Sequence, residues 1–444
     1  MNFSADDLNA VLDAHLPRGT AGIVAAVSGG ADSAGLLVTL CATGASCRGL
    51  PVRAVHVDHG LQPAAASFRE ACASLCKRLN VPLTVVEAPV ASAPGTSIEA
   101  AARDARYAAL ASQLLPGECL LTAHHSEDQS ETLLLQALRG AGLKGMSAMP
   151  ICRPLGAGWH LRPLLDVSRG DLRSGAAGGS AAVEDPMNAD MRFDRSYLRH
   201  QVWPLIEQRW PGAAGALART ARHLAEAQLQ LDRTAASPMA ALRDGDALSL
   251  QALRALDQAD RMNTVRFWLR EAGAELPSTA RLTEALRQMF DARTDHLPAI
   301  EWGTHALRRY RRRMYLTPAK LPRLEGLRRW EPSLGSTVDL KDLGRLRWDL
   351  NWGGIDAERL SGELLVRRRS GGETLKPAPR AKTQSVQHLC QSQGVLPWAR
   401  DVLPLVFAGG ALIAVADLWA DARWCVPATR RGLCVVWDRA PIIV

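Results

Sequence analysis

The chain has 444 residues, which is too many for one compact core, so we expect two or three domains. Hydrophobic residues make up 47% of the sequence and charged residues 22%, and no apolar run reaches the roughly 18 residues of a membrane-spanning helix, which excludes a helical membrane protein and predicts a soluble one. The formal net charge of +8 favours a polyanionic partner, although an arginine-rich proteome would give the same balance.

The N-terminus and the cysteines both indicate a cytoplasmic protein. Asp6, Asp7 and Asp13 occupy the segment where a secretory signal would carry a basic stretch and then an apolar one. The nine cysteines are an odd number and contain no Cys-x-x-Cys pair. Reduced thiols are therefore expected, rather than a disulfide framework or a zinc ribbon.

Short β-branched runs alternate with helical patterns from the N-terminus to about residue 150. The runs that read as buried strands are residues 23–27, 52–57, 83–86 and 120–123. The helical patterns between them cover residues 33–42, 64–79 and 97–114, the last opened by Thr96 and Glu99 at capping-box spacing. This order predicts an α/β domain with a mostly parallel, Rossmann-like sheet between helices, in which ligands bind at the carboxyl ends of the strands.

The remainder of the chain changes character twice. A Gly/Ala/Ser stretch at 174–182 reads as a flexible loop, and residues 205–290 have a helical pattern. Beyond 330, strand-like runs at 364–366, 402–407, 412–415 and 434–437 predict a small α+β domain. We therefore expect a catalytic domain at 1–204, a helical domain at 205–325 and a C-terminal domain at 326–444, with the arginine-rich segment 308–313 near the last boundary.

A glycine turn follows the first predicted strand and precedes a predicted helix. It reads Ser28-Gly29-Gly30-Ala31-Asp32-Ser33. Adjacent glycines let backbone N–H groups converge on a phosphate, the two hydroxyls can donate hydrogen bonds, and the helix directs its positive end at the same place. Asp32 would repel phosphate unless it holds a bridging Mg²⁺. An ordinary Gly-Gly turn is the alternative, whereas kinase-type phosphate loops and dinucleotide dehydrogenases are disfavoured because their glycine motifs are absent.

This run resembles the S-G-G-x-D-S signature of the PP-loop ATP pyrophosphatases. The resemblance implies that ATP adenylylates a carbonyl-like oxygen and that pyrophosphate is released. It makes Ser28 to Ser33 the expected ATP site, with Asp32 as a catalytic residue and the ligand of Mg²⁺.

Two further polar runs end predicted strands. His56 and Asp58, followed by His59 and Gly60, end the second strand, and they read as a lining of the nucleotide pocket or as a metal site. In the run 122–132, Ser126 and Gln129 have capping-box spacing, so a helix should begin just after His124 and its neighbour.

Two carboxylates lie in the first turns of that helix. Asp128 and Glu131 share one helix face at spacing i, i+3. They would either take part in the reaction or only interact favourably with the positive end of the helix dipole. The run 122–132, with Glu99-Ala-Ala-Ala-Arg103, the segment 184–188 and the C-terminal segments at 371–374 and 397–400, resembles the tRNA(Ile)-lysidine synthases.

That resemblance implies an ATP-dependent ligation of free L-lysine to carbon 2 of the first anticodon cytidine in an isoleucine tRNA with a CAU anticodon. The modified tRNA would then read AUA and be charged with isoleucine. Asp128 and Glu131 are expected to bind the lysine ammonium and assist its deprotonation, because the ordinary pKa of a lysine side chain is about 10.4. The remaining expected site residues are His56, Asp58 and His124 for ATP, Arg106 and Arg139 for the substrate, and Arg195, Arg199, Arg368 and Arg400 for tRNA.

Three other functions stay open at this point. A tRNA thiolase of the same loop family would carry cysteine pairs, a non-catalytic nucleotide sensor would not need the acids beside the loop, and an amidating ligase would carry a glutaminase-like region. Arg103 and Arg106 would alternatively pair with Glu99 and Asp104 on a solvated helix face. No membrane partner is expected, and the oligomeric state is left open, with a homodimer as one option.

Overall fold

The computed structural model describes residues 3–42, 49–58, 65–89, 98–175, 190–293, 296–360 and 362–439. Its contacts divide the chain into two units, residues 1–231 and 232–444, and each unit is described by itself. The finer boundaries expected near 204 and 325 stay predictions. No helix among the described residues combines the length and the apolar character needed to cross a bilayer.

The first unit alternates strands and helices in the predicted order. Its elements are α1 (Ala5–His15), β1 (Gly22–Ala26), α2 (Ala31–Ala42), β2 (Val52–Asp58), α4 (Ala65–Leu79), β3 (Leu83–Glu87), α5 (Ile98–Ser112), β4 (Glu118–Leu121), α6 (Ser126–Leu138), α7 (Leu143–Met146), β5 (Cys152–Leu155), β6 (Gly158–Leu161), α8 (Arg169–Gly175), α9 (Asp194–Tyr197), a π-helical turn (Leu198–Val202), α10 (Trp203–Arg209) and α11 (Ala213–Ala236). The four predicted strands and the three predicted helices between them are confirmed, with shifts of at most two residues at their ends. The prediction that all four strands are buried was wrong for β3, which lies at the edge of the sheet and is partly exposed.

The six strands form one sheet in the order β3-β2-β1-β4-β6-β5. Strands β3, β2, β1, β4 and β6 run parallel, and only β5 pairs antiparallel, with β6. The predicted parallel α/β fold is therefore confirmed. The chain passes from β1 outward to β2 and β3 and then returns to β4 on the other side of β1. The order of the strands therefore reverses between β1 and β4, and open parallel sheets bind ligands at such a reversal.

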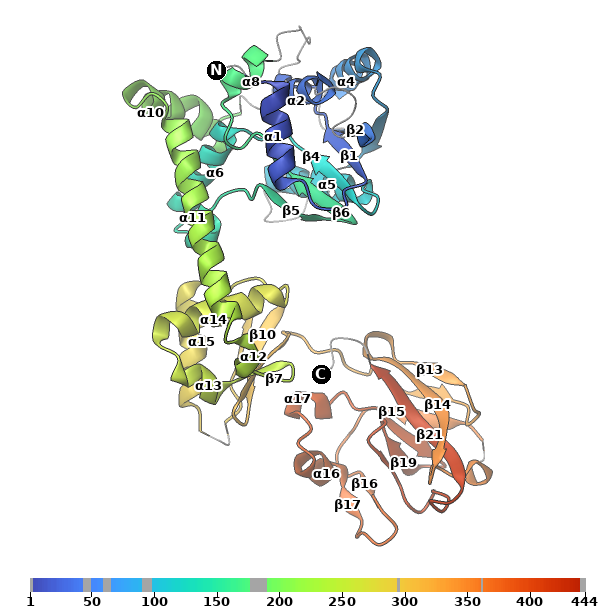
Figure 1. Ribbon diagram of the computed structural model, residues 1–444. Coiled ribbons are helices and arrows are strands. Elements are labelled where there is room, and N and C mark those ends of the chain that lie inside the picture. Colours follow the sequence, from blue (N-terminus) through green and yellow to red (C-terminus); the bar gives the residue numbers. More distant parts are fainter. Residues whose placement is uncertain are drawn as a thin grey trace. The chain divides into compact units, whose positions relative to one another are not determined.

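Both faces of the sheet are buried, as the unbroken apolar sequence of β1 requires. Ile23 and Ala25 face a core that includes Leu8 of α1 and Leu36 of α2. Figure 1 shows these two helices beside the strands of the sheet. The intervening residue, Val24, faces a smaller core with Leu110 of α5 and Leu120 of β4. Successive side chains of a strand point to opposite faces, so five residues of β1 anchor two helical layers.

Helix α6 begins at Ser126, as predicted, but its cap differs from the prediction. The N-cap residue is His125, whose backbone N–H donates to the Asp128 carboxylate at 3.2 Å. Gln129 points instead into the core, where its amide exchanges two hydrogen bonds of 2.9 Å with the backbone of Met149. The predicted pairing of Ser126 with Gln129 was therefore wrong, because the buried Met149 backbone competes successfully for the Gln129 amide.

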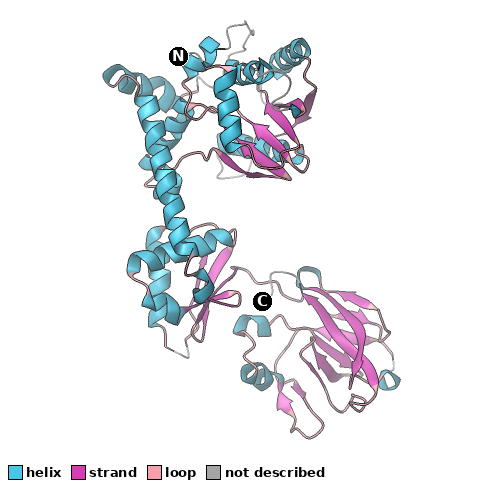
Figure 2. Cartoon of the chain, viewed as in Figure 1, coloured by secondary structure: helices cyan, strands magenta, loops and turns pink. Residues whose placement is uncertain are grey.

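The second unit begins with a compact helical part that also contains a sheet. Its elements are α12 (Met239–Leu242), β7 (Arg243–Asp244), β8 (Ala247–Ser249), α13 (Leu250–Ala255), α14 (Gln258–Glu271), α15 (Thr279–Asp291), β9 (Ala299–Trp302), β10 (His305–Tyr310) and β11 (Arg313–Pro318). The strands pair antiparallel in the order β7-β8-β11-β10-β9 (Figure 2). The helices were predicted, whereas this sheet was not, and the arginine-rich segment 308–313 forms its central hairpin.

The C-terminal part is mostly strand, as predicted. Its elements are β12 (Arg328–Trp330), β13 (Thr337–Asp339), β14 (Gly344–Trp352), β15 (Leu364–Arg367), β16 (Thr374–Leu375), β17 (Gln384–Ser385), α16 (Val386–Ser392), α17 (Pro397–Arg400), β18 (Leu405–Ala408), β19 (Ala411–Val415), β20 (Trp419–Ala420) and β21 (Arg431–Arg439). The rings of Trp330 and Trp348 stack 4.4 Å apart in its core. Strand β18 starts later than predicted, at Leu405, because Pro404 has no N–H to donate to a neighbouring strand.

Several predicted features lie outside the described residues. These are His59 and Gly60, the capping residue Thr96, most of the loop 174–182 and the segment 184–188.

Candidate active site

The candidate site lies where β1 and β4 end side by side in the sheet. Their register pairs Ala25 with Leu121, so the loops that follow them emerge together at the carboxyl edge. The loop after β1 carries Ser28 to Ser33, and the loop after β4 carries His124 and His125. Two motifs almost a hundred residues apart in sequence therefore become neighbours.

The two serines of the first loop form hydrogen bonds within the loop. The Ser28 N–H donates to Ser33 Oγ at 3.1 Å, and the Ser33 hydroxyl donates to the Gly30 carbonyl at 3.0 Å. The two hydroxyl oxygens are also 3.1 Å apart. Helix α2 starts at Ala31, and the first N–H groups of a helix have no partner within it. The hydroxyls thus hold the turn in shape, while a helix N-terminus provides the donors for an anion.

Gly29 is required by this turn for two reasons. Its φ of +85° lies in the left-handed region that side chains rarely adopt. A Cβ at this position would also stand 2.9 to 3.1 Å from atoms of Phe68 on α4, including its backbone. The contact fixes the glycine turn against α4, next to the pocket beside Asp58 described below.

Asp32 extends from the first turn of α2 into a ring of cations. Its carboxylate lies 3.3 Å from Arg169 Nε, 3.3 Å from Arg173 Nε and 3.7 Å from His125 Nε2. Burial favours the neutral acid, but the hydrogen bond from His125 and the charges of these residues together hold the pKa of Asp32 below its ordinary value. Asp32 is therefore a carboxylate at neutral pH, and its side chain remains 24% exposed.

His125 joins three carboxylates and is itself buried. Its Nδ1 lies 2.9 Å from Glu127 Oε2 and its Nε2 lies 3.4 Å from Asp128 Oδ2, in addition to the contact with Asp32. His125 Nδ1 and Glu127 Oε2 are close enough for an ion pair, but their alignment does not meet the geometry of a hydrogen bond. Burial lowers the pKa of His125, but the hydrogen bonds and charges of these acids outweigh it and raise the pKa to about 9. The imidazole is therefore protonated at neutral pH.

This protonation predicts a pH-dependent stability. The pKa of His125 is about 9 in the folded chain and 6.5 when unperturbed. The contribution of protonated His125 to the free energy of unfolding is therefore complete below about pH 6.5 and is lost as the pH rises through 9. A shift of this size corresponds to about 3 kcal/mol. We expect the difference in thermal midpoint between wild type and His125→Gln to shrink steadily from pH 6.5 to 9.5, measured by calorimetry. A difference that does not change with pH would contradict this role.

Asp128 and Glu131, the two acids of α6, are both paired with arginines. Glu131 is 2% exposed and receives Arg195 Nε at 2.8 Å and Arg199 Nε at 2.7 Å. Asp128 Oδ1 lies 3.1 Å from Arg195 and 3.0 Å from Arg199. Burial favours the neutral acid, but the charges of His125, Arg195 and Arg199 hold the pKa of Asp128 far below its ordinary range. The acids expected to bind lysine and the arginines expected to bind tRNA thus form one cluster.

The whole cluster has one positive charge in excess, which suits an anionic ligand. It consists of four carboxylates, four guanidinium groups and one imidazolium: Asp32, Glu127, Asp128, Glu131, Arg169, Arg173, Arg195, Arg199 and His125. Arg169 and Arg173 were not singled out from the sequence. Their spacing of four residues at the start of α8 puts both on one helix face, which was the available signal.

His124 points away from this cluster. Its Nδ1 lies 2.7 Å from Thr122 Oγ1, which also contacts His160 Nε2 at 2.8 Å. Burial first, and the nearby arginines second, lower the pKa of His124 to about 3. The side chain is therefore neutral, and its expected contact with ATP stays a prediction.

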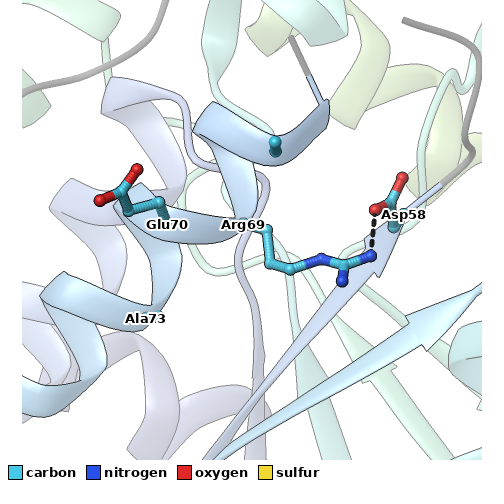
Figure 3. A pocket seen from close by; sticks show the side chains of 5 residues that line it. Asp58, Arg69, Glu70 and Ala73 are labelled. Carbon is cyan, nitrogen blue, oxygen red and sulfur yellow. Dashed lines mark hydrogen bonds and ion pairs between the residues drawn. The ribbon is translucent and has the colours of Figure 1, made fainter. Parts of the chain in front are cut away.

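The two residues expected to line the nucleotide pocket differ in orientation. His56 is 4% exposed, and its Nδ1 lies 2.9 Å from the Val27 carbonyl, so it connects the ends of β2 and β1. Asp58 lines a pocket of about 410 Å³ with residues of α4, and it pairs with Arg69 at 2.7 Å. Figure 3 shows Arg69 reaching toward Asp58 while Glu70 points away. No group of three potential metal ligands is found among the described residues, and His59 lies outside them.

Comparisons with known proteins show the family of the chain. The chain is 40% identical over 417 residues to the tRNA(Ile)-lysidine synthase of Alkalilimnicola ehrlichii, covering 93% of each chain. It is 38% identical to that of Methylococcus capsulatus, covering 93% of this chain and 95% of the relative, and 38% identical to that of Coxiella burnetii, covering 88% and 87%.

The chain belongs to the tRNA(Ile)-lysidine synthase family.

Family models extend this membership to all three parts of the chain. A model described as the PP-loop domain matches residues 4–206, the TilS substrate binding domain matches 248–315, and the TilS substrate C-terminal domain matches 364–437. Both family resemblances drawn from the motifs are therefore confirmed.

The ion pairs that define the cluster do not include the other residues expected to be functional in this tRNA(Ile)-lysidine synthase family member. Arg106 is exposed on α5, and Arg139 at the end of α6 pairs with Asp194 at 3.2 Å on the surface. In the second unit, Arg368 is exposed, whereas Arg400 donates to the Val395 carbonyl at 2.8 Å and to the Tyr310 hydroxyl at 3.3 Å. Their contacts with substrate or tRNA stay predictions.

Proposed function

We propose that this chain ligates free L-lysine to carbon 2 of the first anticodon cytidine of an isoleucine tRNA with a CAU anticodon. ATP is the co-substrate, and AMP and pyrophosphate are the products. The observation that carries the proposal is the meeting of the glycine turn at 28–33 with a largely buried acid–arginine cluster at adjacent strand ends. Membership in the family supports the same activity.

The first step would activate the base. The 2-oxo oxygen of cytidine attacks the α-phosphorus of ATP, and the bond to the β-phosphate oxygen breaks to release pyrophosphate. The turn at 28–33 and the N-terminus of α2 would hold the pyrophosphate, while Arg169 and Arg173 neutralise its charge. The pocket beside Asp58 would take the nucleoside, because Phe68 of the same helix touches the turn. The product is an O-adenylyl cytidine with a good leaving group.

Asp32 fits a magnesium ligand. Its cation contacts of 3.3 to 3.7 Å are longer than the roughly 2.7–2.9 Å of tight charge-assisted hydrogen bonds, so the carboxylate can exchange a partner. Mg²⁺ is commonly bound by one or two carboxylates together with substrate phosphates. When bound, the ion would offset the charge that develops on the departing phosphates.

The second step would join lysine to the activated base. The ε-nitrogen bonds to C2 of the cytidine, and the bond between C2 and the AMP oxygen breaks. The amine must first lose a proton, and we infer that the carboxylates of Asp128 and Glu131 bind the ammonium group and accept this proton. Both already pair with Arg195 and Arg199, and Asp128 also lies near His125, so the ammonium would enter as a further cation in a shared network. This makes the arginines positioning residues for the acids.

The remaining features of the proposal concern the cell and the partner molecules. The second unit would bind the tRNA backbone, and exposed Arg368 is one residue available for it. Within the hairpin at 308–313, Arg309 instead donates to the carbonyls of Met289 and Ala292, which end helix α15. We place the enzyme in the cytoplasm, where tRNA is modified, and a homodimer stays a prediction that light scattering can test.

A direct assay tests the proposal. The protein is incubated with Mg-ATP, radiolabelled lysine and an isoleucine tRNA with a CAU anticodon. We expect label to enter the tRNA in a one-to-one ratio with AMP. Incorporation without ATP, or none with ATP in a folded sample, would reject the function.

A further inference from the structure

Glu127, which directly precedes Asp128 on helix α6, is the one carboxylate of the cluster without a role in the proposed reaction. Its two oxygens are bound by groups of the protein itself. The backbone N–H of Arg169 donates to both oxygens at 3.1 Å, and the Ser126 hydroxyl donates to Oε2 at 3.1 Å. His125 Nδ1 lies 2.9 Å from the same Oε2. Glu127 therefore connects parts of the fold and is not free to exchange its partners for a substrate.

Helix α8, which receives one of these connections, needs anchors outside itself. It has seven residues, and a helix this short is not stable alone in water. Leu172 is 1% exposed and packs the helix against the core. The Ser168 hydroxyl caps the N-terminus, because it accepts the Asp171 N–H at 3.0 Å. Glu127 accepts the N–H of Arg169, the first residue of the helix, so a second cap comes from α6.

The position of α8 determines where its two arginines lie. Arg169 Nε and Arg173 Nε each lie 3.3 Å from the Asp32 carboxylate, and the two side chains are 41% and 48% exposed. Since the surroundings leave these side chains so exposed, their location depends on the helix that carries them. Glu127 also pairs with His125, whose Nε2 lies 3.7 Å from Asp32. A movement of α8 away from Glu127 would therefore draw both guanidinium groups away from the glycine turn.

The geometry points to Glu127 as a positioning residue that holds α8 where Arg169 and Arg173 meet the pyrophosphate leaving ATP. The inference rests on the proposed function and deepens it. Preorganised cations lower a barrier only when they already stand where charge develops. A misplacement of about 1 Å by a residue outside the chemistry can cost about 100-fold in rate. Glu127 acts on the reaction through α8 and touches no reacting atom.

The first test measures pyrophosphate release in single-turnover reactions with saturating Mg-ATP and tRNA. Glu127→Met keeps a long side chain but offers no oxygen to α8, so release should slow roughly 10- to 100-fold. Glu127→Gln keeps an amide oxygen that can still accept the Arg169 N–H, so it should recover most of the wild-type rate. Glu127→Ala takes the place of Glu127→Met if the latter does not fold.

A double-mutant cycle distinguishes positioning through α8 from general damage to the fold. Arg169→Met combined with Arg173→Met removes both guanidinium groups and should itself be slow. Adding Glu127→Met to this pair should cause little further loss, because no guanidinium group is left for Glu127 to place. A residue that supported only the fold would slow release by the same factor in both backgrounds.

Glu118→Met is the matched control. Glu118 also accepts a backbone N–H, from Leu115 at 2.8 Å, and also pairs with a cation, Arg53. It lies at the amino end of β4, whereas the site lies at the carboxyl end. At a temperature where circular dichroism shows a folded chain, Glu118→Met should release pyrophosphate at the wild-type rate.

Three results would overturn the inference. They are a wild-type rate in Glu127→Met, a rate in Glu127→Gln no faster than that in Glu127→Met, and losses that multiply in the double-mutant cycle. Failure of the proposed function looks different, since wild type itself would then release no pyrophosphate in response to tRNA, and the inference would fall with it.

Discussion

Replacing Asp32 with asparagine is expected to slow tRNA-dependent pyrophosphate release from ATP about 10³-fold, the scale found when one preorganised electrostatic contact is removed. Asparagine keeps the size of the side chain but removes the charge that would hold Mg²⁺ at the phosphates. Because the pKa of Asp32 is lowered, the wild-type residue is fully ionised at neutral pH, so the substitution removes a complete charge. Pyrophosphate release under single-turnover conditions measures the effect without requiring lysine.

The control is Asp246→Asn, which changes an exposed acid in the turn between β7 and β8. It should release pyrophosphate at the wild-type rate. Circular dichroism of both variants establishes that the fold is retained. If Asp32→Asn kept more than about a third of the activity, Asp32 would only anchor the arginines of α8, and the magnesium role would be rejected.

The parallel sheet and the glycine turn could be predicted because both are local in sequence. The apolar run 23–27 identifies a buried strand by itself, and the turn that follows needs only its own glycines and the helix after it. The expectation that ligands bind at the carboxyl ends of the strands followed from topology, since parallel strands end at one edge.

The ion pairs of the site could not be predicted because they are distant in sequence. Arg169 lies 137 residues from Asp32, and Arg199 lies 68 residues from Glu131. Spacing places an acid and an arginine on their own helix faces, but not the two helices against each other. The sequence therefore could not show that the acids of α6, predicted to bind lysine, pair with the arginines at 195 and 199, predicted to bind tRNA; both roles stay predictions.

The sheet of the second unit was missed for a related reason. Strands β10 and β11 carry arginines at 308, 309 and 313, and charged residues mask the alternation that identifies a strand. Leu307 and Met314 are fully buried, but an arginine stands directly beside each of them in the sequence. Only the pairing of the two strands shows that these residues share a core with α15.

Replacing Glu131 with glutamine is expected to abolish lysine transfer while destabilising the first unit by about 3–5 kcal/mol, the cost of breaking a buried ion pair from one side. Glu131 is 2% exposed and accepts hydrogen bonds of 2.8 Å from Arg195 Nε and of 2.7 Å from Arg199 Nε. Glutamine removes one of the two carboxylates that pair with these guanidinium groups and leaves Asp128 as the other. Calorimetry measures the stability, and lysine incorporation at a temperature where the variant is folded measures the transfer.

A second buried acid in the same unit serves as a control that distinguishes a catalytic role of Glu131 from a structural one. Glu118, at the amino end of β4, pairs with Arg53 at 2.5 Å, far along the strand from the site. Glu118→Gln should also lower the thermal midpoint, yet transfer lysine at the wild-type rate. In Glu131→Gln, lysine incorporation should fall at least about 100-fold, the lower range for general acid–base catalysis, while pyrophosphate release continues. If both variants lost lysine transfer in proportion to their stability, Glu131 would serve the fold alone, and the ammonium site would have to lie elsewhere at the edge of the sheet.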